Sequence, residues 1–151
     1  ADRLFCYHAS LDEFVEEMED QYDLIISNPP FYCEDYKTGS SQRDLARFTD
    51  ALPFKHLIDG VAKLLSENGM FTTVVPYKEE NKLRLLASEV NLFVNRILHV
   101  KGSPSSEIKR SLIEFSFREC ETIINELIIE TSRHQYTNDY INLTKDFYLK
   151  M

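Results

Sequence analysis

Apolar residues occur along the chain in short runs separated by polar segments, and the spacing of these runs predicts the secondary structure. Short apolar runs predict strands at 3–8, 22–27, 70–75 and 92–100. Apolar residues repeat every three or four positions at 53–66 and 79–90, which predicts helices there. Strands that alternate with helices favour a parallel sheet and therefore an α/β fold.

Residues that start or stop elements add detail to this pattern. Ser10 precedes Glu13 by three positions, which predicts a capping box and a short acidic helix that runs through Met18. Gly69 predicts a left-handed end to the helix at 53–66. The run at 22–27 is almost continuously apolar, which is typical of a strand buried on both faces of a sheet.

The pattern changes after position 100. A polar turn at 102–106 joins two β-rich runs, the second at 112–118, and their short spacing predicts an antiparallel hairpin at the sheet edge. The apolar run at 123–130 fits either a strand or a helix. A terminal helix is predicted at 137–149, with four side chains facing inward: Tyr140, Leu143, Phe147 and Tyr148.

Composition narrows the class of protein. The 151 residues, 43 % of them hydrophobic, predict one folded domain over 1–151. No apolar run approaches the roughly 18 residues of a membrane helix, so we expect a cytoplasmic protein without a membrane partner. The three cysteines form no Cys-x-x-Cys pair and the four histidines lack ligand spacing, so no metal site is predicted.

The formal net charge of −8 does not argue against an RNA partner. Seven acidic residues and no basic ones lie between positions 12 and 23, which leaves a charge of −1 for the rest of the chain. The negative charge is therefore local.

The sequence Asn28-Pro29-Pro30-Phe31, at the end of the 22–27 run, carries the strongest chemical signal. Ligands bind at the carboxyl ends of strands in open parallel sheets. A residue that precedes proline is restricted to extended backbone, so two successive prolines predict a stiff elbow with outward-pointing carbonyl groups. An ordinary proline turn that ends a strand is the alternative interpretation.

Such an elbow suits chemistry on the exocyclic amine of a base, whose lone pair is delocalised into the ring. The side-chain carbonyl of Asn28 and the backbone carbonyl of Pro29 are candidate acceptors for the amine hydrogens. Phe31 is the candidate for stacking on a flipped base, a contact worth about 1–3 kcal/mol. Proximity to a methyl donor supplies most of the rate in this hypothesis, without a covalent nucleophile or a metal.

These four residues resemble the signature [Asn/Asp/Ser]-Pro-Pro-[Tyr/Phe/Trp] of the N6-adenine methyltransferases of the class I, Rossmann-like, S-adenosylmethionine-dependent group. The chain further resembles the bacterial tRNA(Val) adenine-N6 methyltransferases at 23–31, 41–43, 46–49, the hairpin near Ser111 and 140–151. The resemblance implies S-adenosylmethionine as cofactor, tRNA as partner and methylation of an adenosine beside the anticodon. It implies catalytic roles for Asn28, Pro29, Pro30 and Phe31.

Two departures from this family concern the cofactor. The four glycines never lie within two residues of one another, so this chain cannot form the family's glycine-rich cofactor loop. The family's acidic residue after the strand that here ends near His8 is replaced by Ala9-Ser10. Ser10 and Asn28 are the remaining candidate cofactor contacts, although Ser10 is also the predicted helix cap.

The missing loop leads us to expect that this chain is the carboxyl-terminal part of a longer methyltransferase domain. We therefore expect weak binding of the methyl donor by the chain alone. Uncovered apolar surface and an unpaired sheet edge would also favour self-association.

Basic residues form two candidate RNA-binding groups. Lys37, Arg43 and Arg47 lie in the polar loop after Phe31, and the two arginines are four positions apart. The second group surrounds the predicted hairpin and comprises Arg96, His99, Lys101, Lys109 and Arg110. Contacts to RNA phosphates are the functional interpretation, and ion pairs on a solvated surface are the alternative.

Two other functions remain open at this point. Enzymes that methylate the side-chain amide of glutamine in release factors have the same elbow, because an amide nitrogen poses the same lone-pair problem. A non-catalytic RNA-binding module that has lost its cofactor loop is the second alternative. An NAD-dependent oxidoreductase fits the sheet alone and has no supporting residues.

Overall fold

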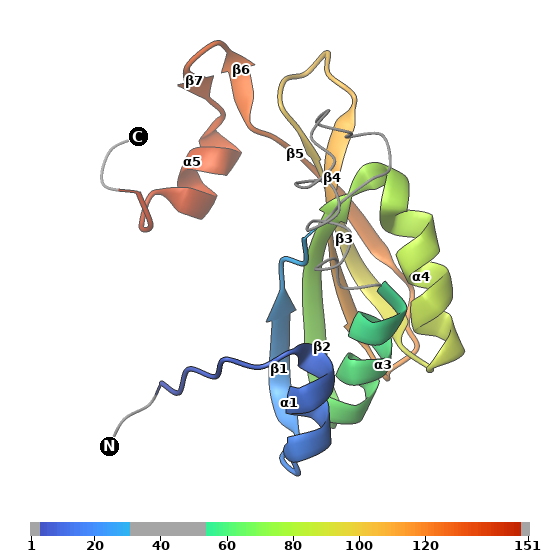
Figure 1. The fold of residues 1–151 in the computed structure, drawn as a ribbon. Coiled ribbons are helices and arrows are strands. Elements are labelled where there is room, and N and C mark those ends of the chain that lie inside the picture. The colour runs from blue at the N-terminus through green and yellow to red at the C-terminus, as the bar shows by residue number, and fades with distance from the viewer. Residues whose placement is uncertain (1–3, 31–53, 149–151) are drawn as a thin grey trace, which may run out of the picture.

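The computed structural model describes residues 4–30 and 54–148, which form an α/β fold around a five-stranded sheet (Figure 1). The strand order is β1-β2-β4-β3-β5. The strands are β1 (Tyr22–Ser27), β2 (Leu65–Pro76), β3 (Phe93–Lys101), β4 (Ile108–Ser116) and β5 (Ile123–Ile128). Only β4 runs antiparallel to its neighbours in this sheet, so the predicted mostly parallel sheet is confirmed.

Helices α3 (Phe54–Leu64) and α4 (Glu80–Glu89) cover one face of the sheet, and α1 (Leu11–Glu17) packs beside α3 (Figure 1). The buried core lies between this helical layer and the sheet. Its side chains include Leu57, Ile58, Leu83, Phe71, Ile97, Ile113 and Phe115. A short 3-10 helix, η1 (Tyr77–Glu79), links the end of β2 to α4.

The predicted start of α1 is confirmed in detail. The Ser10 hydroxyl accepts a hydrogen bond from the Glu13 amide at 3.3 Å, and the Ser10 amide donates to the Glu13 carboxylate at 2.8 Å. Gly60 lets α1 approach α3 closely, because a Cβ at Gly60 would lie 3.2 Å from side-chain atoms of Leu11 and Val15.

The predictions for the segment at 4–8 and for Gly69 are wrong. No strand is present at 4–8, where Leu4 and Phe5 are 86 % and 71 % exposed. A strand requires a hydrogen-bonded partner, and no described segment pairs with these residues. Gly69 does not end a helix but lies within β2, where a Cβ would approach the Tyr22 carbonyl oxygen to 2.9 Å. Close packing rather than a left-handed turn therefore explains this glycine.

The antiparallel hairpin is present, but it does not form the sheet edge. β4 lies between β2 and β3, and β5 pairs with the outer side of β3. Ser111, Ile113 and Phe115 alternate along β4 and are at most 1 % exposed. A strand with such a fully buried face needs neighbours on both sides, whereas the largely exposed β5 tolerates the edge.

β1 is also less buried than its sequence predicts. Leu24 and Ile26 are 52 % and 73 % exposed, whereas Ile25 packs against the core. β1 is at an edge of the sheet, and the described helices cover only one of its faces. The prediction of burial on both faces is therefore wrong for the described residues.

The end of the described chain forms a small hairpin, β6 (Glu130–Ser132) and β7 (Gln135–Tyr136), followed by α5 (Asn138–Thr144). Figure 1 shows this unit standing away from the five-stranded sheet. Leu143, Phe147 and Tyr148 are 57 %, 86 % and 56 % exposed, so the prediction that they face inward is wrong. α5 has only seven residues, and its end at Thr144 leaves the last two aromatic residues outside it. None of the helices within 4–30 and 54–148 has the length and apolarity of a membrane span.

Candidate active site

The elbow at Asn28-Pro29-Pro30 leaves the sheet at the carboxyl end of β1, as its sequence predicts. Ser27, the last residue of β1, is in register with Thr73 of β2. Pro29 is buried, whereas Asn28 and Pro30 are exposed. The Asn28 side chain is therefore accessible to solvent. The buried Pro29 beside it holds the backbone of the elbow in place.

The local sequence explains why β1 delivers the elbow to this position. Ile25 contacts the core from the centre of the strand. Near its start, the Asp23 carboxylate accepts a 2.7 Å hydrogen bond from the Ser66 hydroxyl of β2. These two contacts hold β1 against the core and against β2. They thereby fix the position of the Asn28 backbone relative to the sheet.

Several candidate residues lie outside the described part of the chain. They are Phe31 of the motif and the basic residues Lys37, Arg43 and Arg47. Their catalytic and RNA-binding roles stay predictions.

Ser10 serves as the cap of α1 through both its hydroxyl and its amide. Its hydroxyl donates to the Glu13 carboxylate at 2.9 Å, so both sides of the capping box are satisfied locally. Hydrogen bonds from the Ser10 backbone and side chain hold the pKa of Glu13 below its usual value. A cofactor contact from Ser10 stays a prediction.

His99 of the basic group around the hairpin lies 2.8 Å from Glu80, and the other four residues divide into two sets. Arg96 lies 3.9 Å from Glu114, and Lys101 lies 2.8 Å from Glu126, as the ion-pair alternative predicts. Lys109 and Arg110 are exposed and have no ion-pair partner among the described residues. Arg110 is in register with Pro76, the last residue of β2. It therefore lies at the end of the sheet where β1 and β2 terminate, which is also the end that carries the elbow.

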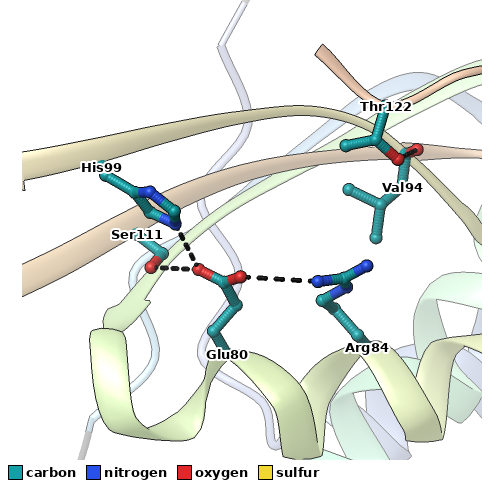
Figure 2. A network of polar contacts seen from close by, with 6 residues as sticks. All are labelled: Glu80, Arg84, Val94, His99, Ser111 and Thr122. Atoms are coloured by element: carbon teal, nitrogen blue, oxygen red, sulfur yellow. Dashed lines mark hydrogen bonds and ion pairs between the residues drawn. The ribbon is translucent and has the colours of Figure 1, made fainter. Parts of the chain in front are cut away.

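A buried polar network lies at this edge on the helical side of the sheet (Figure 2). The Glu80 carboxylate accepts a 2.6 Å hydrogen bond from the Ser111 hydroxyl, and the same oxygen lies 2.8 Å from Nε2 of His99. Arg84 approaches the other carboxylate oxygen at 3.6 Å. Glu80 thereby links the start of α4 to β3 and β4.

This network could not be identified from the sequence. The spacing of Glu80 and Arg84 is compatible with a helical ion pair, and that was its only local signal. His99 and Ser111 are 19 and 31 residues away from Glu80 in sequence, and the antiparallel register alone places them side by side.

The described residues do not form a complete site for a methyl donor. Among the described glycines, Gly60 and Gly69 are explained by close packing of Leu11 and of Tyr22 with Leu65. Gly102 lies in the β3–β4 turn, where a Cβ would make an ordinary contact with the Ser106 hydroxyl oxygen at 3.8 Å. No described glycine therefore forms a backbone cradle for a nucleoside, and Asn28 is left as the candidate donor contact at the sheet edge.

Solved structures support the fold. The protein Atu636 from Agrobacterium tumefaciens, described as a predicted O-methyltransferase, matches with a TM-score of 0.56 over 82 % of this chain and 51 % of its own. The M1.HpyAVI-SAM complex matches with a TM-score of 0.52 over 87 % of this chain and 59 % of its own. Identities of 15 % and 12 % limit these similarities to the fold. No family model matches the sequence.

Curated relatives are much closer in sequence. A protein from Flavobacterium johnsoniae is 60 % identical over 151 residues, which cover 99 % of this chain and 64 % of the relative. One from Bacteroides fragilis is 42 % identical over 87 % of this chain and 55 % of the relative. The chain thus spans less than two thirds of the length of these relatives. By sequence it is similar to these bacterial proteins, which are named tRNA1(Val) (adenine(37)-N6)-methyltransferase.

Proposed function

We propose that the chain is part of an enzyme that transfers a methyl group from S-adenosylmethionine to N6 of an adenosine in tRNA. The adenosine beside the anticodon of tRNA(Val) is the proposed target. The exposed Asn28 on its proline elbow carries this proposal, together with the name shared by relatives that are up to 61 % identical. That name favours adenine over the glutamine-amide and non-catalytic alternatives.

The elbow would act by holding and polarising the amine. In this proposal the Asn28 side-chain oxygen and the Pro29 carbonyl oxygen accept the two amine hydrogens. These contacts draw the nitrogen toward a tetrahedral shape and make its lone pair available. The nitrogen that has bonded the methyl carbon then releases one of its two hydrogens as a proton to solvent. Burial of Pro29 supports the role, because acceptors that are fixed before the reaction need no reorganisation during it.

S-adenosylmethionine supplies the methyl group when it is bound. The described glycines give it no cradle, so the proposal places most of its contacts outside the described residues. Asn28 is the residue of this chain at which the donor and the amine would meet.

The tRNA would be held by contacts to its phosphates. Lys109 and Arg110 are exposed at the same sheet edge as the elbow, which supports a role in backbone binding. Lys37, Arg43 and Arg47 are proposed to add to these contacts. Such a substrate implies a cytoplasmic protein. No cluster of side chains suited to a metal occurs within the described ranges, and the proposed steps call for none.

The test is the Asn28→Ala variant, made in the chain joined to the segment by which the Flavobacterium johnsoniae relative is longer. Loss of a fixed transition-state acceptor should slow turnover about 30- to 1,000-fold while the protein stays folded. Asn125→Ala is the matched control, because Asn125 is also exposed but lies within β5. Methylation of the tRNA(Val) anticodon hairpin at the unmodified rate by Asn28→Ala would contradict the proposal.

A further inference from the structure

A cavity lies at the carboxyl end of the sheet, beside the β3–β4 turn. Its volume is about 390 Å³, and its lining residues are Tyr77, Lys101, Ser105, Ser106, Glu107 and Ile108. This volume is within the usual range of small-molecule sites. Tyr77 is 44 % exposed, so its ring forms an accessible wall of the cavity.

The Tyr77 ring is supported from behind. The His99 ring meets it edge to face, with the ring centroids 5.2 Å apart and an interplanar angle of 88°. His99 is in turn held at 2.8 Å by the buried Glu80, which Ser111 and Arg84 also contact (Figure 2). The network on the helical side of the sheet therefore fixes the orientation of an exposed aromatic ring.

The other lining groups suit a nucleotide. Lys101 carries a positive charge, although it is shared with Glu126 at 2.8 Å. Ser105 adds an exposed hydroxyl, whereas the Ser106 hydroxyl is bonded to the backbone of Ser103. Glu107 adds a negative charge to the lining, opposite in sign to that of Lys101. Together the lining offers an aromatic face, a cation and a hydroxyl, which are the groups that bind a base and its sugar-phosphate backbone.

The cavity lies at the same end of the sheet as the elbow. β1 and β2 are adjacent parallel strands, and Ser27 is in register with Thr73. The elbow begins at the residue after Ser27, and Tyr77 follows the end of β2 at Pro76. Adjacent strands are about 4.8 Å apart and residues rise about 3.3 Å along a strand, so Tyr77, three residues beyond the position level with Asn28, lies roughly 11 Å away. The nucleotide beside a flipped-out base can bridge such a distance.

From these observations we propose that Tyr77 and the cavity beside it form a flanking-nucleotide subsite, which stacks an unpaired base next to the adenosine held at the elbow. His99 and Glu80 are positioning residues that hold the Tyr77 ring. The inference rests on the proposed function for its RNA ligand. It assigns to Tyr77 a binding role that is separate from the chemistry at Asn28.

The probe is an RNA hairpin with the sequence of the tRNA(Val) anticodon stem-loop, carrying 2-aminopurine on one side or the other of the target adenosine. Stacking on tyrosine quenches 2-aminopurine fluorescence, so one of the two probes should be quenched on binding. Tyr77→Phe keeps the aromatic face and should behave like the parent chain. Tyr77→Ala should lose the quenching and weaken binding roughly 5- to 100-fold.

Tyr136→Ala is the matched control, because Tyr136 is 39 % exposed but belongs to β7 rather than to the cavity. Thermal unfolding monitored by circular dichroism verifies that each variant is folded. Equal quenching and affinity for Tyr77→Ala and the parent chain would overturn the subsite, as would equal losses in Tyr77→Ala and Tyr136→Ala.

Methyl transfer to the same RNA, measured in the chain joined to the segment by which the Flavobacterium johnsoniae relative is longer, separates this inference from the proposed function. Tyr77-dependent quenching without any methylation of the target adenosine would support the subsite and overturn the proposed function. Methylation that depends on Asn28, with quenching independent of Tyr77, would support the proposed function and overturn the subsite. Failure of the RNA to bind at all would overturn both.

Discussion

The two faces of the central sheet are made by the same strands but differ sharply in burial. Phe71 and Phe115 face the helices and are fully buried, whereas Leu24, Ile26 and Leu112 are 52 %, 73 % and 40 % exposed on the other face. Side chains alternate between faces along a strand, so these differences arise between adjacent residues. Apolar residues on both faces are the pattern of a sheet covered on both sides, and the described helices cover one.

The uncovered face also contains polar groups. A hollow of about 350 Å³ on this face brings Leu98 and Leu112 together with the Arg96 and Glu114 ion pair. The helix-covered face instead contains a compact polar network around Glu80 and the buried hydroxyl of Thr73, and the rest of its centre is apolar. The covered face thus holds the buried core, whereas the other keeps a mixed surface of apolar and charged side chains.

The largest predicted effect distinguishes the stabilities of the two faces. Phe115→Ala should lower the free energy of unfolding by about 3–5 kcal/mol, because it leaves a cavity beside the stacked ring of Phe71. Ile26→Ala should change it by less than about 1 kcal/mol, because most of that side chain is already in water. Urea unfolding of both variants measures the difference. Equal losses would mean that the faces do not differ in this way.

The second prediction concerns the polar network of the covered face. Glu80→Ala should lower the free energy of unfolding by about 2–3 kcal/mol, because it leaves the buried Ser111 hydroxyl without an acceptor. Glu80→Gln should cost less, since its amide oxygen can still accept that hydrogen bond. Glu89→Ala, at an exposed position of the same helix, is the control and should have little effect. Urea unfolding measures the free energy of unfolding of both variants. Equal values for Glu80→Ala and Glu89→Ala would show that the network contributes nothing to stability.

The third prediction concerns the uncovered face and the free edge of β1. The chain alone should self-associate, and Leu24→Lys with Ile26→Lys should weaken association about ten-fold or more by placing charge on apolar surface. Sedimentation velocity over a range of concentrations measures this change. Leu85→Lys is the control, because Leu85 is 68 % exposed on α4. A monomeric parent chain, or equal weakening by the control, would contradict the prediction.

Local patterns predicted those parts of the fold that depend on local interactions. The box of Ser10 and Glu13 formed because its partners are three residues apart. Asn28 emerged at a strand end because its prolines cannot continue the strand's hydrogen bonding. These features depend on neighbouring residues, and the sequence displays neighbours directly.

Features that depend on distant partners were predicted poorly. The segment at 4–8 has the composition of a strand but pairs with no described strand. Gly69 could not be assigned without knowing that the Tyr22 carbonyl lies against it. The contacts of Glu80 with His99 and Ser111 depend on the register of β3 and β4, which no sequence motif specifies. In each case the sequence contained the residue but not the identity of its neighbour.

The smallest predicted effect is at the surface of α1, on the covered side. Hydrogen bonds from Ser10, first from its backbone and then from its side chain, lower the pKa of Glu13 in the folded chain. A folded pKa below the unfolded value means that Glu13 stabilises the fold above the unfolded pKa. This contribution is lost as the pH falls through the folded pKa.

The Glu13→Gln variant keeps a hydrogen-bonding side chain at this position but removes its charge. Glu13→Gln should therefore be slightly less stable than the parent chain at neutral pH, and the gap should close in acid. Thermal unfolding of both proteins across that pH range measures the gap. A gap that persists unchanged after Glu13 is protonated would show that the carboxylate charge is not what stabilises the cap. Because the cap lies at the surface, its loss should leave the contrast between the two sheet faces unchanged.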